Sequence, residues 1–299
     1  MEKKGITSPK KKISEFITEH VLLLKNETTY QWCLAVECDL EKFRIFCERE
    51  GVLFLKDINI AVLEKYKSEQ FATVKRVTVA NKMKVIKAML NRAVRYDHIL
   101  SNPAKMVTPV QGIPKSRDRI LSNEEIPKMQ EAVKGMYLEN LVITALYTGM
   151  RRKELIWLDY EDVDIADRTI HIKHKKGFSP KSRKERVIPL HQKLIPLFEG
   201  KTQWICFPYY DVWRKRFVHD RRLNEKSITT RFRELMDKIG LEGVGLHTLR
   251  HTFASHCVMQ GMSLKTVGEI LGHSSVTMTE RYSHVLTEHM LKEVDKLTF

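Results

Sequence analysis

Four short clusters in the second half of the chain combine cationic side chains with side chains that carry protons. The first contains Arg151, which lies two positions after a glycine and three positions before Glu154. This spacing predicts a guanidinium group at the start of a new helix. Taken alone, it is also typical of a surface arginine.

The second cluster, residues 180–190, has Lys181 on a polar, basic turn between two short stretches of alternating, strand-like sequence. A lysine at such a turn can contact an anion and can donate a proton. A solvated basic turn is the alternative. Lys173, Lys175 and Lys176 lie close by in the sequence, so the turn offers several amines.

In the third cluster, residues 246–253, His247 and Arg250 are three positions apart and share one face of a predicted helix. His247 and His251 have the i, i+4 spacing of a zinc pair. The glutamate of HExxH is absent, no third ligand is evident, and Arg250 would repel a cation, so we exclude zinc. A capped helix with incidental histidines is the alternative.

The fourth cluster pairs His273, on a loop after a glycine, with Tyr282 nine residues later. Tyr282 is predicted on a short helix capped by Ser274 or Ser275. A lone tyrosine usually has a packing role. A phenol is a poor nucleophile unless its proton is removed or its electrophile is strongly activated.

Together the four clusters can perform chemistry on a phosphodiester. Arginines bind non-bridging oxygens bidentately, histidines and a lysine transfer protons, and a tyrosine supplies a nucleophile. No carboxylate cluster for Mg²⁺ and no GxxxxGK[ST] sequence occur in the chain, so we expect no metal and no nucleotide cofactor.

This pattern resembles the tyrosine recombinases of the phage-integrase superfamily, whose motif is Arg…Lys…His-x-x-Arg…His/Trp…Tyr. The matching segments are TGMRRKEL, PKSRKERVIPL, GLHTLRHTFASH, LGHSS and ERYSHV, between about residues 120 and 285. They supply the six positions of the motif in order: Arg151, Lys181, His247, Arg250, His273 and Tyr282.

The resemblance implies that Tyr282 attacks the scissile phosphate of DNA and forms a 3′-phosphotyrosyl bond. Arg151 and Arg250 would then stabilise the transition state, and Lys181 would protonate the leaving 5′ oxygen. His247 would assist proton transfer at the tyrosine.

The same resemblance assigns His273 a hydrogen bond to a phosphoryl oxygen. It also implies a site-specific recombinase, Xer-like or encoded by a mobile element, that acts in integration and excision or in chromosome-dimer resolution. It implies a monomer when free, a homotetramer on paired sites in double-stranded DNA, and a Holliday junction. A type IB topoisomerase-like strand transferase and a catalytically idle DNA-binding accessory protein are the alternatives.

The elements that must hold these residues form a mainly α fold with a small β-sheet. Residues 13–102 predict a helical, SAM-like core-binding domain, with helices from Ile13, from about Thr28, after a cap at Asp57, and over 79–95. The outer face of the last helix is basic and is our candidate for contact with the major groove, although such faces are also typical of solvated helices. Its members are Lys82, Lys84, Lys87, Arg92 and Arg95.

Residues 103–118 hold three prolines and a glycine and predict an interdomain linker. Residues 119–285 predict an α+β catalytic domain that opens with Ser122 and Glu125 as a capping box. Strands are expected at 169–173 and 186–190. Residues 286–299 predict a helix whose apolar face docks on a neighbouring protomer or, alternatively, on its own domain.

Composition agrees with a DNA-binding role. The 299 residues carry 52 Lys and Arg against 37 Asp and Glu, a net charge of +15 that favours a polyanionic partner. The chain has no apolar run long enough to cross a membrane and no signal peptide, and residues 1–12 predict a basic tail. The five cysteines form no CxxC pair, so we expect reduced thiols in a cytoplasmic, nucleoid-associated protein.

Overall fold

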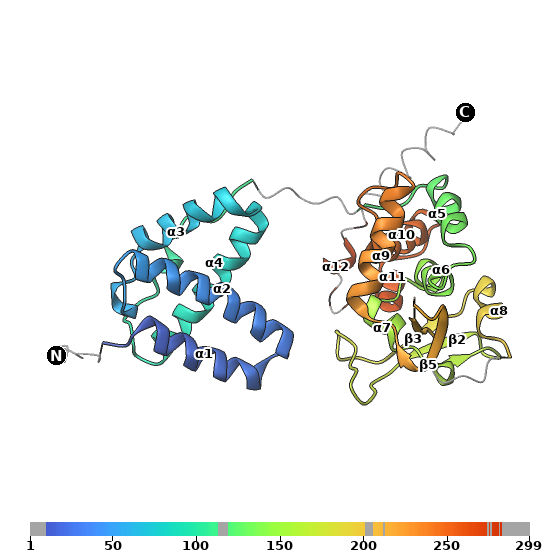
Figure 1. The fold of residues 1–299 in the computed structure, drawn as a ribbon, viewed down its shortest axis with the longest axis horizontal. Helices are drawn as coiled ribbons and strands as arrows, with labels where there is room; N and C mark the ends of the chain where they lie inside the picture. The colour runs from blue at the N-terminus through green and yellow to red at the C-terminus, as the bar shows by residue number, and fades with distance from the viewer. Residues whose placement is uncertain are drawn as a thin grey trace. The chain divides into compact units, whose positions relative to one another are not determined.

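The computed structural model describes residues 10–112, 119–200, 206–211, 213–273, 275, 277–280 and 282. The chain divides into two compact units, Met1–Ser116 and Arg117–Phe299, coloured blue to cyan and green to red in Figure 1. No helix in this described part is long and apolar enough to cross a membrane. The helix predicted for residues 286–299 lies outside it.

The first unit is helical, as its sequence predicts. Its elements are α1 (Ile13–Glu27), α2 (Tyr30–Arg49), the 3₁₀ turn η1 (Leu55–Asp57), α3 (Ile60–Thr73), α4 (Arg76–Arg95) and the 3₁₀ turn η2 (Pro103–Lys105). The apolar sides of the four α-helices enclose one core. Within it, the rings of Phe43 and Phe46 meet the ring of Tyr66 edge to face, with centroids 5.1 Å apart in each pair.

Two boundaries of this unit differ from the prediction. Asn59, and not Asp57, caps α3, because η1 buries Leu55 and takes up Asp57 before the helix begins; the Asn59 side chain accepts from Val62 N at 3.0 Å. The basic tail ends before residue 12. The carbonyl of Lys11 accepts a hydrogen bond from Leu55 N at 3.0 Å, and residues 1–9 lie outside the described part.

The predicted basic face of α4 is also partly wrong. Lys82 is buried, and its ammonium group donates to Gln70 of α3 at 2.5 Å. Arg92 is half-buried and pairs with Glu27 of α1 at 2.5 Å. Both cations therefore belong to contacts between helices, whereas Lys84, Lys87 and Arg95 are exposed.

The start of the segment predicted as a linker packs on the helical unit. Ala104 is buried, Lys67 donates to the carbonyl of Thr108 at 2.8 Å, and Arg76 donates to that of Gln111 at 3.1 Å. Residues 113–118 lie outside the described part.

The second unit joins helices to short antiparallel strands. Its elements are α5 (Glu125–Val133), α6 (Glu139–Thr148), α7 (Arg152–Ile156), η3 (Tyr160–Asp162), β1 (Val163–Asp164), β2 (Thr169–Ile172), β3 (Arg186–Pro189), η4 (Gln192–Leu194), α8 (Ile195–Phe198), β4 (Pro208–Asp211), β5 (Arg216–Arg222), α9 (Glu225–Lys238), α10 (Leu246–Met259), α11 (Leu264–Leu271) and α12 (Thr277–Glu280). The strands form sheets in the orders β1-β2-β3 and β4-β5.

The predicted strands and capping box of this unit are confirmed. Ile170 of β2 lies opposite Ile188 of β3, and both side chains are buried. Glu125 and Ser122 exchange hydrogen bonds, with Ser122 N 2.9 Å from the Glu125 carboxylate and Glu125 N 3.2 Å from the Ser122 hydroxyl. Helix α10 packs on α6. The third sequence cluster therefore lies close to the C-terminal end of α6, where the first cluster begins.

Candidate active site

Arg151 is held at the junction of α6 and α7. Gly149 ends α6 in the left-handed conformation, with φ +62°, and the chain then turns into α7. Glu154 accepts from the backbone N of Arg151 at 2.9 Å and from its guanidinium at 3.1 Å. The second terminal nitrogen of Arg151 donates to the carbonyl of Gly272 at 2.9 Å.

Arg250 reaches the same place from α10. Its side chain is buried and donates to the carbonyls of Gly149 and Leu271, at 2.8 Å each. Burial, and next the positive charge of Arg151, lower the pKa of Arg250 to about 9. Arg250 therefore remains a cation at neutral pH.

A third arginine, Arg186 of β3, completes this cluster. It donates to both carboxylate oxygens of Glu154, at 3.0 and 2.7 Å, and to the carbonyl of Ile270 at 2.8 Å. Burial alone would raise the pKa of Glu154, but the hydrogen bonds and charges of Arg186 and, next, Arg151 together outweigh it and hold that pKa below its usual range. The carboxylate of Glu154 thus pairs with the guanidinium groups of Arg151 and Arg186, and Arg250 adds a third cation to the cluster, which leaves a surplus of positive charge.

Two of the predicted histidines flank the arginines. His247 is exposed in the first turn of α10, and its ring meets that of His251 edge to face with centroids 4.6 Å apart. His273 follows the left-handed Gly272, which ends α11 with φ +68°. Its Nδ1 lies 2.7 Å from the hydroxyl oxygen of Thr279 in α12.

Tyr282 lies just beyond α12, which ends at Glu280, and not inside it as predicted. Its backbone N donates to the carbonyl of Thr279 at 2.9 Å. The side chain is 2 % exposed and packs among apolar residues of α10 and α11. Its hydroxyl oxygen is 2.8 Å from Nδ1 of His251. Of the two predicted caps, Ser275 accepts a hydrogen bond from Met278 N through its backbone carbonyl at 3.2 Å, and Ser274 lies outside the described residues.

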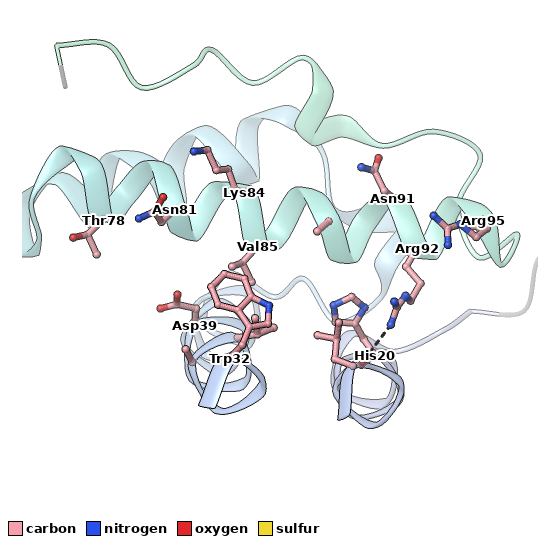
Figure 2. A pocket seen from close by; sticks show the side chains of 14 residues that line it. His20, Trp32, Asp39, Thr78, Asn81, Lys84, Val85, Asn91, Arg92 and Arg95 are labelled. Carbon is pink, nitrogen blue, oxygen red and sulfur yellow. Dashed lines mark hydrogen bonds between the residues drawn. The ribbon is translucent and has the colours of Figure 1, made fainter. Parts of the chain in front are cut away.

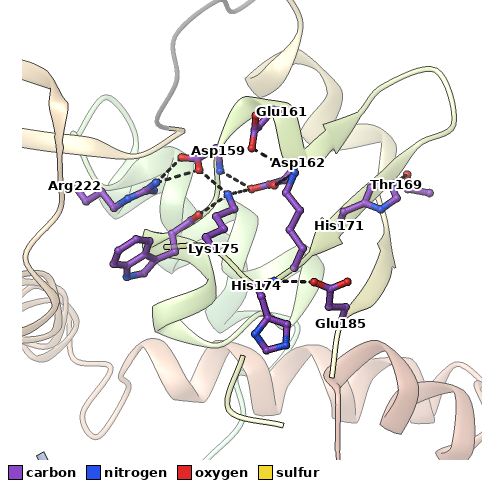
Figure 3. A network of polar contacts seen from close by, with 11 residues as sticks. Asp159, Glu161, Asp162, Thr169, His171, His174, Lys175, Glu185 and Arg222 are labelled. Atoms are coloured by element: carbon purple, nitrogen blue, oxygen red, sulfur yellow. Dashed lines mark hydrogen bonds and ion pairs between the residues drawn. The ribbon is translucent and has the colours of Figure 1, made fainter. Parts of the chain in front are cut away.

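The lysines near the turn after β2 differ in their contacts, as Figure 3 shows for the network around Lys175. The ammonium of Lys175 donates to Asp159 at 2.6 Å, to Asp162, and to the carbonyl of Trp157 at 3.0 Å. Lys173 pairs with Asp162 at 3.1 Å. These two amines are therefore committed to buried carboxylates.

The same network fixes the base of the turn. Phe178 stacks on Trp157 with centroids 5.7 Å apart, and Arg222 lies 4.6 Å from the centroid of the Trp157 ring. Farther along, the backbone N of His174 donates to Glu185 at 2.9 Å across the turn. Lys181 lies within this turn, between His174 and Glu185, and is exposed.

A groove of about 770 Å³ crosses the surface of the first unit (Figure 2). Helix α4 runs along one side, and α1 and α2 supply the other through residues such as His20 and Trp32. Exposed polar residues of α4 that line the groove recur at helical spacing: Thr78, Asn81, Lys84, Asn91 and Arg95. Of the five basic residues predicted from the sequence, Lys82 and Lys87 do not line it.

The structure brings four of the predicted residues into one connected arrangement. Arg151 and Arg250 meet at the end of α11, His273 follows that end, and Tyr282 is tied to α10 through His251. The sequence analysis missed Arg186 and assigned no role to His251. The signal for Arg186 in the sequence was its place in the predicted strand 186–190, directly after the basic turn.

The chain was compared with known proteins. Residues 119–289 match the model of the phage integrase family, and residues 12–108 match the phage integrase SAM-like domain. The chain is 28 % identical to tyrosine recombinase XerC of Thermodesulfovibrio yellowstonii over 95 % of both chains. It is 30 % identical to tyrosine recombinase XerA of Pyrococcus horikoshii over 68 % of both chains.

Solved structures share the fold. The Tn1549 transposon integrase in complex with a circular intermediate DNA superposes with a TM-score of 0.74 and 17 % identity, over 95 % of this chain and 99 % of that one. A lambda integrase dimer bound to a core site gives a TM-score of 0.74 at 18 % identity, over 92 % and 78 %. The chain belongs to the phage integrase family and is a tyrosine recombinase, an enzyme of site-specific DNA cleavage and rejoining.

Proposed function

We propose that Tyr282 is the nucleophile of this recombinase and that Arg151 and Arg250 hold the scissile phosphate. The convergence of these two guanidinium groups on the carbonyls of Gly272 and Leu271 carries the proposal. Two fixed cations beside each other match the non-bridging oxygens of a phosphodiester. They would stabilise the negative charge that builds up on those oxygens in the transition state.

In the cleavage step, the bond from phosphorus to the Tyr282 oxygen forms as the bond to the 5′ oxygen breaks. Lys181 gives a proton to the leaving 5′ oxygen, and His247 assists removal of the phenolic proton. His273 donates a hydrogen bond to a phosphoryl oxygen. The 3′-phosphotyrosyl bond retains the energy of the broken phosphodiester bond. A 5′-hydroxyl can therefore rejoin the strand without hydrolysis of a nucleotide cofactor.

The groove along α4 is our candidate for base contact in the first unit. Its Asn81, Asn91 and Arg95 offer amide and guanidinium groups to base edges on one exposed stripe, and Lys84 beside them offers an ammonium group to a phosphate. Asparagine pairs well with adenine, and arginine or lysine with guanine, in the major groove.

We further propose that the protein acts on paired recombination sites in double-stranded DNA. Four protomers assemble there from free monomers, in the cytoplasm at the nucleoid, and pass through a Holliday junction. The relatives named XerC and XerA, together with the DNA complexes of integrases that share this fold, support this assignment. Both chromosome-dimer resolution and integration or excision of a mobile element are consistent with it. Residues 286–299 would dock on a neighbouring protomer.

Trapping on a suicide substrate tests the proposal. A nicked site releases a short oligonucleotide on cleavage, so that a covalent protein–DNA adduct accumulates. Tyr282→Phe should bind the half-site like the wild type and yield no adduct, because only the hydroxyl is lost. An adduct with that variant would assign the nucleophile to another residue, and no adduct with the wild type would favour an idle accessory protein.

A second assay separates recombination from the action of a type IB topoisomerase. The recombinase should join a cleaved strand to a strand from a partner duplex, and should yield recombinant product on two paired sites. Relaxation of supercoils without any strand exchange would instead support the topoisomerase-like alternative.

A further inference from the structure

His251 lies within hydrogen-bond distance of the proposed nucleophile, and the proposed cleavage mechanism does not use it. Its Nδ1 lies 2.8 Å from the Tyr282 hydroxyl oxygen, and both side chains are buried. We propose that His251 is a positioning residue that aligns the Tyr282 hydroxyl for attack through this hydrogen bond. The inference rests on the proposed role of Tyr282.

The backbone that carries His251 is fixed on both sides. The preceding residue, Arg250, is held by the carbonyls of Gly149 and Leu271. In the following residue, Thr252, the hydroxyl accepts from Leu121 N at 2.9 Å and donates to the carbonyl of Thr248 at 2.9 Å. The imidazole therefore starts from a rigid segment of α10, directly beside a phosphate-binding arginine.

The ring of His251 is fixed as well. The ring of His247 packs edge to face against one side of it, with centroids 4.6 Å apart. The ring of Tyr282 approaches with centroids 5.9 Å apart and an angle of 50°. A side chain with locked rotation can hold its partner in one direction, which is what alignment of a nucleophile requires.

The Tyr282 segment needs such a restraint. Tyr282 follows a helix of four residues; its backbone N donates to the carbonyl of Thr279, and its hydroxyl oxygen lies 2.8 Å from Nδ1 of His251. The hydroxyl bond joins it to the helix that also carries Arg250. His251 thus sets the distance between the attacking oxygen and the arginine that holds the phosphate.

The test uses His251→Leu, which removes the hydrogen bond, and His251→Asn, whose amide lies at the position of Nδ1. Single-turnover cleavage of a suicide substrate, half-site affinity and thermal unfolding are measured for each. We expect His251→Leu to cleave about 10- to 100-fold more slowly, the loss typical of a misaligned reacting group, at unchanged half-site affinity. His251→Asn should stay within about threefold of the wild type, because it restores a hydrogen bond from the same place.

His256→Asn is the matched control, since this histidine lies on the same helix and contacts the carbonyl of Leu121 at 3.1 Å. It should cleave at the wild-type rate. Wild-type or faster cleavage by His251→Leu would overturn the inference, and so would an Asn variant as slow as the Leu variant at equal stability. Tyr282→Phe is assayed in parallel. An adduct with that variant would refute the nucleophile itself, whereas normal His251 variants beside an inactive Tyr282→Phe would refute the positioning role alone.

Discussion

Arg151 and Arg250 donate hydrogen bonds to the carbonyls of adjacent residues, Gly272 and Leu271, although 99 positions of sequence separate the two arginines. The C-terminal end of α11 therefore acts as a common anchor for both guanidinium groups. The partial negative charge at a helix C-terminus stabilises cations there. One local turn therefore fixes both cations.

Gly149 links this anchor to α6, and its replacement should be costly. A Cβ atom at Gly149 would lie 2.5 Å from Cδ1 of Phe253 and 2.7 Å from Cδ2 of Leu271. We expect Gly149→Ala to lose about 1–2 kcal/mol from its left-handed conformation and about 1–3 kcal/mol more from overpacking. Gly135→Ala, at φ +71° with open space around it, should lose only the first part. Equal losses in urea denaturation would contradict this account.

Glu154 should be the most costly of the site's charges to remove. Its buried carboxylate is bound by Arg186 at 2.7 Å and by Arg151 at 3.1 Å. We expect Glu154→Gln to lower the free energy of unfolding by about 3–5 kcal/mol, because buried guanidinium groups lose their counter-charge. The control is Glu225→Gln, which breaks an exposed pair with Arg152 and should cost about 0–1 kcal/mol. Chemical denaturation measures both variants, and similar losses would argue against a buried ionic network.

The sequence predicted the family and the two domains, because tyrosine recombinases share a diagnostic set of motifs. It did not predict the partnership of Arg186 with Glu154. Alternation along β3 identifies which side chains share a face of the sheet, but it does not identify the helix that covers that face.

The burial of Lys82, which the sequence analysis placed on the outer face of α4, could have been predicted from its spacing. Lys82 is three positions after Val79 and four before Ile86, both of which are buried. This spacing puts Lys82 on the inner side of the helix. Its buried contact is possible because Gln70 of α3 supplies an oxygen at 2.5 Å, a tertiary partner that no pattern within α4 contains.

His20 should make the protein less stable in mild acid. It is buried in α1; burial, and next the charge of Arg92, lower its pKa from 6.5 to about 4. The unfolded chain therefore binds a proton below about pH 6.5 that the folded chain refuses until about pH 4, so stability falls as the pH falls through this window. We expect about 2 kcal/mol of the free energy of unfolding to be lost between pH 7 and pH 5.

His20→Gln should remove that part of the pH dependence. Urea denaturation of both proteins at the two pH values gives the comparison, and His256→Gln serves as a control at a histidine of the other unit. Parallel curves for the wild type and His20→Gln would show that His20 does not titrate as described.

Replacement of Lys84 by alanine should affect DNA binding, whereas replacement of Lys82 should affect stability. Lys84 is exposed on the α4 groove, whereas Lys82 is buried against Gln70. If Lys84 contacts a phosphate, Lys84→Ala should weaken DNA binding and reduce the slope of log affinity against log salt by about 1. Lys82→Ala should leave that slope unchanged and lower thermal stability. Equal salt slopes for Lys84→Ala and the wild type would exclude a phosphate contact at this position.

Lys181 should be the one lysine of its turn whose loss is rescued by a better leaving group. A general acid matters in proportion to the need of the leaving atom for a proton. An alkoxide needs one, whereas a thiolate does not, because the pKa of a thiol is about 8.5. Lys181→Ala should therefore cleave ordinary DNA very slowly and regain much of its rate when sulfur replaces the scissile 5′-bridging oxygen.

The neighbouring lysines are the controls for this experiment. Lys175 and Lys173 are bound to Asp159 and Asp162, so their alanine variants should lose stability and show no selective rescue by sulfur. Lys176→Ala, at an exposed position outside these pairs, should resemble the wild type on both substrates. Arg151→Ala and Arg250→Ala should stay slow on both, because their charge acts on the non-bridging oxygens. Single-turnover cleavage of both substrates decides among them: rescue of Lys176→Ala in place of Lys181→Ala would move the general acid to Lys176, and rescue of neither would move it off the turn.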